Sequence, residues 1–240
     1  MPLRAIYYDT ETTGVKAERD RVIEIAAYDP LLNRRFERFV NPGFPIPPES
    51  TAIHHITDEM VADAPSFAQI GLEFAEFCEG EVVLIAHNND NFDYHFLRLE
   101  YERNQLSMPT HWKFLDTLKW ARRYRSDLPR HTLQFLREIY GVAANNAHRA
   151  LDDVIVLHQV FSYMIDDLEI DEVYSLLNRP RLIQHMPFGK HQGQPLSQIP
   201  RNYIQWLVST GAFDKPENHE LKESFSRLGM LEPAGAAGAA

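Results

Sequence analysis

The first apolar run of the chain ends in two carboxylates. Residues 6–15 read IYYDTETTGV, so Asp9 and Glu11 stand two positions apart. Alternate side chains of a strand point to one face, so these two carboxylates share a face while Thr10 points to the other. Such a pair can approach one cation, but a strand that merely ends in an acidic turn closed by Gly14 has the same pattern. The rest of the chain has to decide between the two interpretations.

Length and composition narrow the class of protein. The 240 residues are 44% hydrophobic, which is enough for one large domain or for a domain with a small appendage. A formal net charge of −10 argues against a general surface for polyanions. The longest apolar run, VVLIA at 82–86, is too short to span a bilayer, and the start lacks a long apolar leader. The chain has one cysteine, which excludes an internal disulfide. From these three features together we expect a cytoplasmic protein with no membrane partner.

One segment departs from the acidic average. KWARRYRSDLPRH, residues 119–131, carries six basic side chains interleaved with Trp120 and Tyr124. A solvated helix face followed by a loop explains this pattern, and we favour that interpretation. Contacts to nucleic acid are the alternative that the segment leaves open.

Periodicity predicts an α/β fold. Strands are expected at 4–10, 22–29 and 34–40, then at 81–88 and near 112–116. An extended loop is expected at 41–50, where ten residues include four prolines. Helices are expected at 66–79, 94–104, 117–124, 131–140 and 149–165. Strands that first form a meander and then alternate with helices predict a mixed five-stranded sheet with helices on both faces.

The composition changes after residue 180. Residues 186–208, MPFGKHQGQPLSQIPRNYIQWLV, predict a small hairpin followed by a helix at 201–209. The end of the chain is of low complexity and predicts a disordered tail. We therefore expect a catalytic domain at 1–180, a small hairpin-helix module at 181–231 and a tail at 232–240.

Three further residues bear on the question raised by Asp9 and Glu11. Asp93 follows the fourth strand at the start of a helix, and His148 stands five residues before Asp153 at the start of a late helix. Each alone would be read as a helix cap or a surface residue. Together, four carboxylates without a thiolate favour hard cations such as Mg²⁺ or Mn²⁺, and a nearby histidine is suited to act as a general base.

In this order and context, the chain resembles the DEDD superfamily of 3′–5′ exonucleases in its His subtype. The ribonuclease H-like fold of that superfamily also occurs in the proofreading epsilon subunit of bacterial replicative polymerase, in RNase T and in exonuclease X. The three motifs of the family match Asp9, Glu11 and Thr12, then Phe92 and Asp93, and finally His148 and Asp153. The sister subclass has Tyr-x₃-Asp as its third motif, but position 149 is Arg. The resemblance covers residues 4–165.

The resemblance implies a mechanism with two Mg²⁺ or Mn²⁺ ions that releases nucleoside 5′-monophosphates from 3′ ends, most readily of DNA. Asp9 would bridge the metals, while Glu11 and Asp153 would help to hold the ion that carries the attacking water. Asp93 would act through the second metal or its waters, and His148 would take the proton of the attacking water. The terminal nucleotide would meet Thr12, Gly14, Ile53, His54 and Phe92.

Several alternatives stay open at this point. An RNA-trimming exoribonuclease of the same family has the same motifs. A phosphatase of the haloacid dehalogenase type would need Asp in place of Glu11, and a catalytically silent binding module would have no need of four carboxylates and a histidine. Single-stranded DNA ends are the expected partner, with RNA, a polymerase or repair protein and a homodimer left open, so both proofreading and DNA repair fit.

The C-terminal module resembles the short module that follows the nuclease domain in exonuclease X-like proteins. Gly189, Lys190 and Gly193 would either shape a turn that touches nucleic acid or simply build the hairpin.

Overall fold

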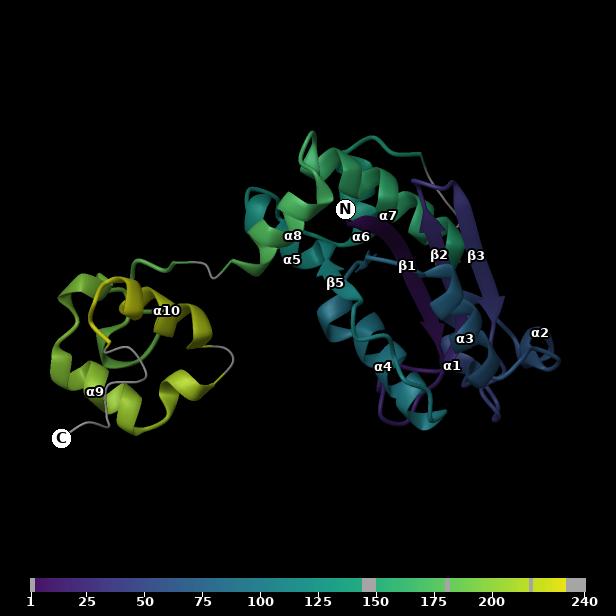
Figure 1. Cartoon of the computed structure of the whole chain (residues 1–240), viewed down its shortest axis with the longest axis horizontal. Coiled ribbons are helices and arrows are strands. Elements are labelled where there is room, and N and C mark those ends of the chain that lie inside the picture. Colours follow the sequence, from purple (N-terminus) through teal and green to yellow (C-terminus); the bar gives the residue numbers. More distant parts are fainter. Residues whose placement is uncertain (1–2, 144–149, 180–181, 216–217, 232–240) are drawn as a thin grey trace. The chain divides into compact units, whose positions relative to one another are not determined.

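The computed structural model describes residues 3–143, 150–179, 182–215 and 218–231. The chain divides into two compact units, residues 1–177 and 178–240 (Figure 1). We refer to them as the N-terminal unit and the C-terminal unit. The predicted disordered tail at 232–240 lies outside the described residues.

A mixed five-stranded sheet forms the centre of the N-terminal unit, as the sequence predicts. Its strands are β1 (Arg4–Thr12), β2 (Val22–Asp29), β3 (Arg34–Phe39), β4 (Val82–Ala86) and β5 (Lys113–Asp116). Their order across the sheet is β3-β2-β1-β4-β5. β1 pairs antiparallel with β2 and parallel with β4, so it is the strand at which the sheet changes from a meander to parallel pairing.

Helices of the N-terminal unit follow the strands. They are α1 (Pro48–His54), α2 (Asp58–Val61), α3 (Phe67–Phe77), α4 (Asp93–Arg103), α5 (Thr117–Tyr124), α6 (Leu133–Ile139), α7 (Ala150–Ile165) and α8 (Ile170–Asn178). Among the described residues, no helix combines the length and the apolar character needed to cross a membrane.

Alternate side chains of β1 point into two different cores. Ile6 and Tyr8 pack with residues of α3 and α4, whereas Tyr7 packs with residues of α5, α7 and α8. The strand period of two therefore assigns one helical layer to the even positions of β1 and another to the odd positions. This alternation decides on which side of the sheet each later side chain of β1 lies.

The extended loop predicted for 41–50 is wrong in its last part. Helix α1 begins at Pro48, after an N-cap at Pro47 with φ −58° and ψ 135°. Proline is compatible with the first turn of a helix because the backbone N–H that it lacks has no intrahelical partner there. The density of prolines therefore marks the start of a helix as well as a loop.

The C-terminal unit has its own small core. Its helices are α9 (Arg201–Ser209) and α10 (His219–Arg227), the second of which the sequence did not predict. The core consists of Met186, Leu196, Ile199, Ile204, Leu207, Phe213, Leu221 and Phe225. The predicted hairpin is reduced to one antiparallel bridge between His185 and Pro195. Pro187 and Pro195 have no backbone N–H to donate, which limits the ladder at this point.

Candidate active site

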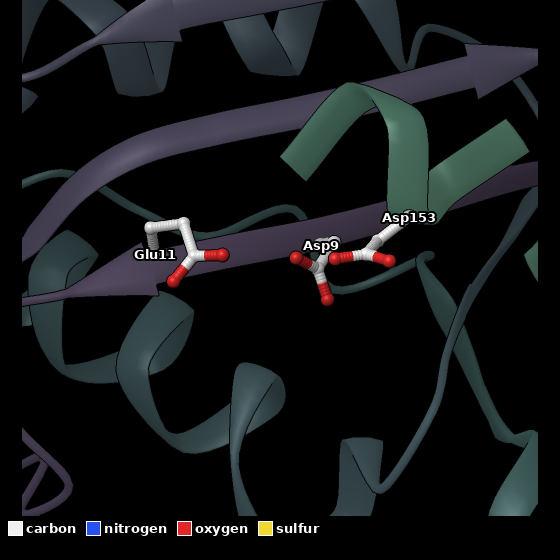
Figure 2. A group of neighbouring side chains, drawn as sticks. All are labelled: Asp9, Glu11 and Asp153. Atoms are coloured by element: carbon white, nitrogen blue, oxygen red, sulfur yellow. The ribbon is translucent and has the colours of Figure 1, made fainter. Parts of the chain in front are cut away.

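Three carboxylates meet above the end of β1. Asp9 and Glu11 project from the strand and Asp153 from the first turns of α7, and one carboxylate oxygen of each lies within 4.8 Å of the others (Figure 2). Figure 2 shows the carboxylates of Asp9 and Asp153 facing each other, with Glu11 further along the same strand. The pair that opened the sequence analysis thus converges with a residue 144 positions after Asp9.

The alternation of β1 explains why these three residues meet. Asp9 and Glu11 occupy odd positions, on the side of Tyr7, which packs with α7. The buried stripe of α7, which includes Ala150 and Val154, seats that helix on the same side of the sheet. Asp153 is therefore carried to the two strand carboxylates by the packing of the helix.

The electrostatics of this cluster favour a cation. Burial raises the pKa of Asp9 well above its usual value, and neighbouring negative charges raise it further, those of Asp93, Glu11, Asp153 and Glu24. Desolvated carboxylates at this separation retain a proton or require a positive charge between them. The ligands are all oxygen atoms and include no thiolate, so the residues present fit a hard divalent cation.

Asp93, at the start of α4, lies near this cluster, and its negative charge is one of those that raise the pKa of Asp9. Its Oδ1 accepts a hydrogen bond from the backbone N–H of Thr10 at 3.1 Å and another from the Thr10 hydroxyl at 2.8 Å. Asp93 is not one of the three residues whose carboxylate oxygens lie within 4.8 Å of one another. Burial raises the pKa of Asp93 to about 7, although the hydrogen bonds from Thr10 oppose that shift.

A fifth acidic residue, Asp116, supports the turn that carries Asp93. It is buried at the end of β5 and accepts hydrogen bonds from the backbone N–H groups of Asn88 at 3.0 Å and Asp90 at 3.1 Å. It also caps α5 by accepting from the N–H of Leu118 at 2.8 Å. The sequence analysis placed this residue in a short strand and gave it no role. Its position at the C-terminal end of a strand, directly before a helix, is the signal that could have identified it as a cap.

A second acidic residue that the sequence analysis did not single out is Glu24. It is fully buried on β2, directly opposite Glu11 in the strand register. Its Oε2 accepts a hydrogen bond from the backbone N–H of Ala150 at 3.4 Å. Because Ala150 is the first residue of α7, this contact ties β2 to the start of the helix that carries Asp153. The carboxylate also suits the positive end of the helix dipole.

Thr12 and Gly14 shape the segment that leaves β1. The Thr12 hydroxyl donates to the carbonyl of Gly14 at 2.6 Å, and the strand register shifts between Glu11 and Thr12. A Cβ atom at Gly14 would lie 2.4 Å from Oδ2 of Asp20, so the Asp20 carboxylate, which accepts from the N–H of Lys16, would have to move. The turn after the two strand carboxylates is thereby held in one conformation.

The other residues predicted to contact substrate differ in exposure. Ile53 on α1 is 56% exposed, whereas His54 is 2% exposed and its Nδ1 accepts from the backbone N–H of Ile56 at 3.0 Å. The Ser50 hydroxyl donates to the carbonyl of Thr13 at 2.8 Å, which holds α1 against the turn after β1. Phe92 packs against Phe96 at 4.9 Å between ring centroids.

His148, the predicted general base, lies outside the described residues. In the basic segment at 119–131, most of the cationic side chains have local partners. Lys119 pairs with Asp90 at 3.2 Å, Arg125 pairs with Asp127 at 3.0 Å, and Arg123 donates to the carbonyl of Leu177 at 3.2 Å. These contacts agree with the favoured interpretation of the segment as a solvated face.

Comparison with known families defines the class of protein. Residues 6–161 match a family described as "Exonuclease", and this match covers more than half of the chain. The chain is also 41% identical over 163 residues to the DNA polymerase III subunit epsilon of Treponema pallidum, an alignment that covers 66% of this chain and 74% of that protein. The chain therefore belongs to the exonuclease family, within the DEDD superfamily. Its activity is that of a 3′–5′ exonuclease.

Solved structures show the same fold. The zinc-bound E. coli exonuclease I complex with single-stranded DNA superposes with a TM-score of 0.62 at 19% identity, over 73% of this chain and 43% of that one. Exonuclease X in complex with 5′-overhanging duplex DNA gives 0.55 at 22% identity, over 72% and 99%. The chain thus spans less than half of the exonuclease I chain. These likenesses confirm the predicted ribonuclease H-like fold.

A second family match covers a short part of the chain. Residues 179–221, in the C-terminal unit, match a family described as "Putative quorum-sensing-regulated virulence factor". This description gives no chemistry for the unit, so its role has to be argued from its own residues.

Proposed function

We propose that the protein degrades DNA from single-stranded 3′ ends and releases nucleoside 5′-monophosphates in a reaction that depends on two Mg²⁺ or Mn²⁺ ions. The observation that carries this proposal is the convergence of Asp9, Glu11 and Asp153 within 4.8 Å, in a setting that raises the pKa of Asp9. The residues would act within the N-terminal unit, which we take to be the exonuclease domain, with the C-terminal unit as an accessory module.

Asp9, Glu11 and Asp153 would hold the cations. When bound, such cations would lower the pKa of a water molecule and would offset the charge that develops on the departing oxygen. Asp93 would contribute from the start of α4, where Thr10 holds its carboxylate by two hydrogen bonds. Glu24 and Asp116 touch no substrate in this scheme and act by positioning α7 and the turn before Asp93.

His148 would move the proton. Water attacks the phosphorus of the terminal phosphodiester, and its proton passes to a ring nitrogen of His148. The bond from phosphorus to the 3′ oxygen of the preceding nucleotide breaks, and that oxygen takes up a proton to leave a new 3′ hydroxyl. An imidazole suits this role because its unperturbed pKa is about 6.5, near the pH at which the enzyme would work.

The terminal nucleotide would lie against the turn after β1. Ile53 is exposed on α1, and an aliphatic wall can pack against any base, which fits a nuclease without sequence preference. Thr12 and Gly14 would present the backbone of the turn to the sugar. Phe92 and the buried His54 would lie beside the terminal nucleotide.

The choice of DNA draws on the relatives. The Treponema protein is named as a polymerase subunit, and the two solved structures are described as complexes with single-stranded DNA and with overhanging duplex DNA. A polymerase or repair protein is the matching partner, and proofreading or DNA repair the matching role. RNA trimming is the second candidate, because nothing in the carboxylate cluster discriminates against RNA. A cytoplasmic location and a homodimer stay predictions.

Digestion of end-labelled single-stranded and duplex DNA and RNA by one preparation tests the proposal. We expect mononucleotides from single-stranded DNA in Mg²⁺ or Mn²⁺, none in EDTA, and slower release from RNA. Asp152→Asn provides a matched control for Asp153→Asn, because the two residues are neighbours on α7 and only Asp153 belongs to the cluster. Full activity of Asp153→Asn would overturn the assignment of the site, and faster release from RNA would favour the second candidate.

A further inference from the structure

The C-terminal unit has a surface pocket that the proposed nuclease reaction does not use. Its volume is about 320 Å³, and it is lined by Lys190, His191, Pro200, Asn202, Tyr203 and Trp206. The sequence analysis assigned the neighbouring glycines and Lys190 either to a turn that touches nucleic acid or to the hairpin itself. The side chains of the pocket favour the first alternative.

Aromatic rings form one wall of the pocket. Trp206 on α9 is 53% exposed, and its ring stacks with that of Tyr203 at 5.4 Å between centroids and 27° between planes. The His191 ring meets Tyr203 edge-on at 4.6 Å. The other two tryptophans, Trp112 and Trp120, are buried in the N-terminal unit. Exposure of the apolar indole ring to water is unfavourable, and exposed aromatic rings of this kind are typical of binding surfaces.

The pocket is built by close packing. Gly189 has φ +75°, and a Cβ atom there would lie 2.5 Å from the Tyr203 hydroxyl. Only glycine both adopts this backbone conformation readily and leaves room for the Tyr203 ring. His191 is held by a hydrogen bond between its Nδ1 and the Gln194 side chain at 2.8 Å. The Tyr203 and His191 rings are therefore held by contacts within the C-terminal unit.

A positive charge lies beside the rings. Lys190 is exposed at the pocket and forms no ion pair with any residue of the described part of the chain. By contrast, Lys222 in the same unit lies 3.9 Å from the carboxylate of Asp214. Residues 178–240 contain seven Lys and Arg against five Asp and Glu, so this unit is net positive within a chain of net charge −10. A cation next to a flat aromatic surface suits a ligand that has both an anionic group and a ring.

We propose that this pocket binds single-stranded nucleic acid, with a base stacked on Trp206 and the adjacent phosphate near Lys190. The proposal rests on the proposed function, because the chain that carries the pocket hydrolyses nucleic acid. Stacking on an aromatic face accepts every base, and a lysine neutralises the backbone without reading sequence. The pocket thus supplies a second, non-hydrolytic contact for the strand that the N-terminal unit shortens.

Tryptophan fluorescence of the full chain in EDTA tests this inference directly. Trp206 is the exposed one of the three tryptophans, so a base that stacks on it quenches the solvent-exposed part of the emission. We expect a 20-nucleotide oligo(dT) to quench that part of the emission, and Trp206→Phe to lose the response. Fluorescence anisotropy of a labelled strand shows when the protein is saturated with oligonucleotide. If the tryptophan emission is unchanged at that concentration, the proposal is wrong, and a protein partner is the next ligand to test.

Affinity of the variants provides a second readout. Trp206→Ala is expected to weaken binding of the 20-mer about 5- to 150-fold, the range for one stacked base. Lys190→Ala is expected to lower the slope of log affinity against log salt by about 0.7, the value for one phosphate contact in a single strand. Val208→Ala, exposed on the same helix, and Lys222→Ala are the matched controls and should bind normally.

Hydrolysis separates a failure of this inference from a failure of the proposed function. Release of mononucleotides from a 4-nucleotide strand in Mg²⁺ reports on the active site. If that release is normal while Trp206→Ala and Lys190→Ala bind the 20-mer like the wild type, the pocket proposal is wrong and the nuclease assignment stands. If release is absent in the wild type, the proposed function itself fails.

Discussion

The two units of this chain use charge in opposite ways. Residues 1–177 contain 17 Lys and Arg against 29 Asp and Glu, whereas residues 178–240 contain seven against five. The N-terminal unit gathers carboxylates at the end of its central strand, and the C-terminal unit exposes a lysine beside stacked aromatic rings. An acidic unit can act on a polyanion only where cations neutralise it locally. We therefore expect hydrolysis to take place in the N-terminal unit and general affinity for the nucleic-acid strand to come from the C-terminal unit.

The largest expected effect comes from the cluster itself. Asp9→Asn removes a cation ligand, and we expect turnover to fall by more than about 100-fold, the upper value for losing a residue that merely supports a ligand. The Tm of the metal-free protein should hold or rise, because the change relieves carboxylate repulsion. Calorimetry and single-turnover hydrolysis measure the two effects. A variant that keeps full activity in Mg²⁺ would contradict the assignment of chemistry to this unit.

His148→Ala separates the effect of proton transfer on turnover from the effect of substrate binding. Turnover is expected to fall roughly 10²- to 10⁴-fold, the usual span for a general base, with binding of metal and strand retained. The loss should therefore appear in kcat. If binding collapses while turnover at saturation survives, His148 contacts substrate and the base lies elsewhere.

Substitutions of Glu24 test whether a buried residue that does not contact the substrate affects turnover. Glu24→Ala removes the acceptor for the N–H of Ala150, so we expect turnover to fall about 10- to 100-fold through displacement of α7. Glu24→Gln keeps an acceptor oxygen and should restore part of that loss. An equal loss of activity in the two variants would show that the charge of Glu24, and not its hydrogen bond, is what matters, and full activity of Glu24→Ala would show that neither does.

Removal of the C-terminal unit tests whether that unit contributes to binding of the strand and not to hydrolysis. A chain that ends near Asn178 keeps all five proposed catalytic residues, so it should still degrade a short single-stranded oligonucleotide. We expect kcat to change less than about twofold and KM for a 20-mer to rise about fivefold, the low end of one lost stacking contact. A truncated protein that folds and binds Mn²⁺ but cannot cleave at saturation would mean that the C-terminal unit completes the active site.

The smallest effect concerns pH and stability without metal. The pKa of Asp93 is raised to about 7 in the folded protein, above the value of about 3.9 in an unfolded chain. Its contribution to stability is therefore full below pH 4 and is lost as pH rises through 7. Asp93→Asn removes this dependence and keeps an acceptor for Thr10. Between pH 5 and 8 in EDTA, the Tm of this variant should gain several degrees relative to that of the wild type, because about 1 kcal/mol shifts the Tm of a protein of this size by about 2–4 °C. Parallel Tm curves would contradict the shift.

Parts of both units could be predicted because their signals are local. The period of two in β1 placed Asp9 and Glu11 on one face, and the structure confirms that they share the side of α7. The helix at 201–209 was predicted with its observed bounds because an apolar stripe and a preceding proline define it. These features depend on neighbours in the sequence.

What could not be predicted depends on pairing between distant segments. Glu24 was recognised as part of the site only from the strand register, which places it opposite Glu11. Nothing in the sequence VIEIAAYD distinguishes Glu24 from an exposed residue of a strand. The hydrogen bonds that Thr10 donates to Asp93 also join distant segments, and no pattern in the sequence indicated them. Helix α10 was missed because HELKESFSR is largely polar and its few apolar residues acquire meaning only against the core of the C-terminal unit.

The distance in sequence between Asp9 and Asp153 has a consequence for biosynthesis. A ribosome has to translate more than 140 further residues after Asp9 before the helix that completes the cluster exists. Non-local contacts of this kind form late, because a long loop has to close before they do. An incomplete or stalled chain therefore carries two strand carboxylates without their third partner. The nuclease is expected to remain silent until its domain has been synthesised and folded.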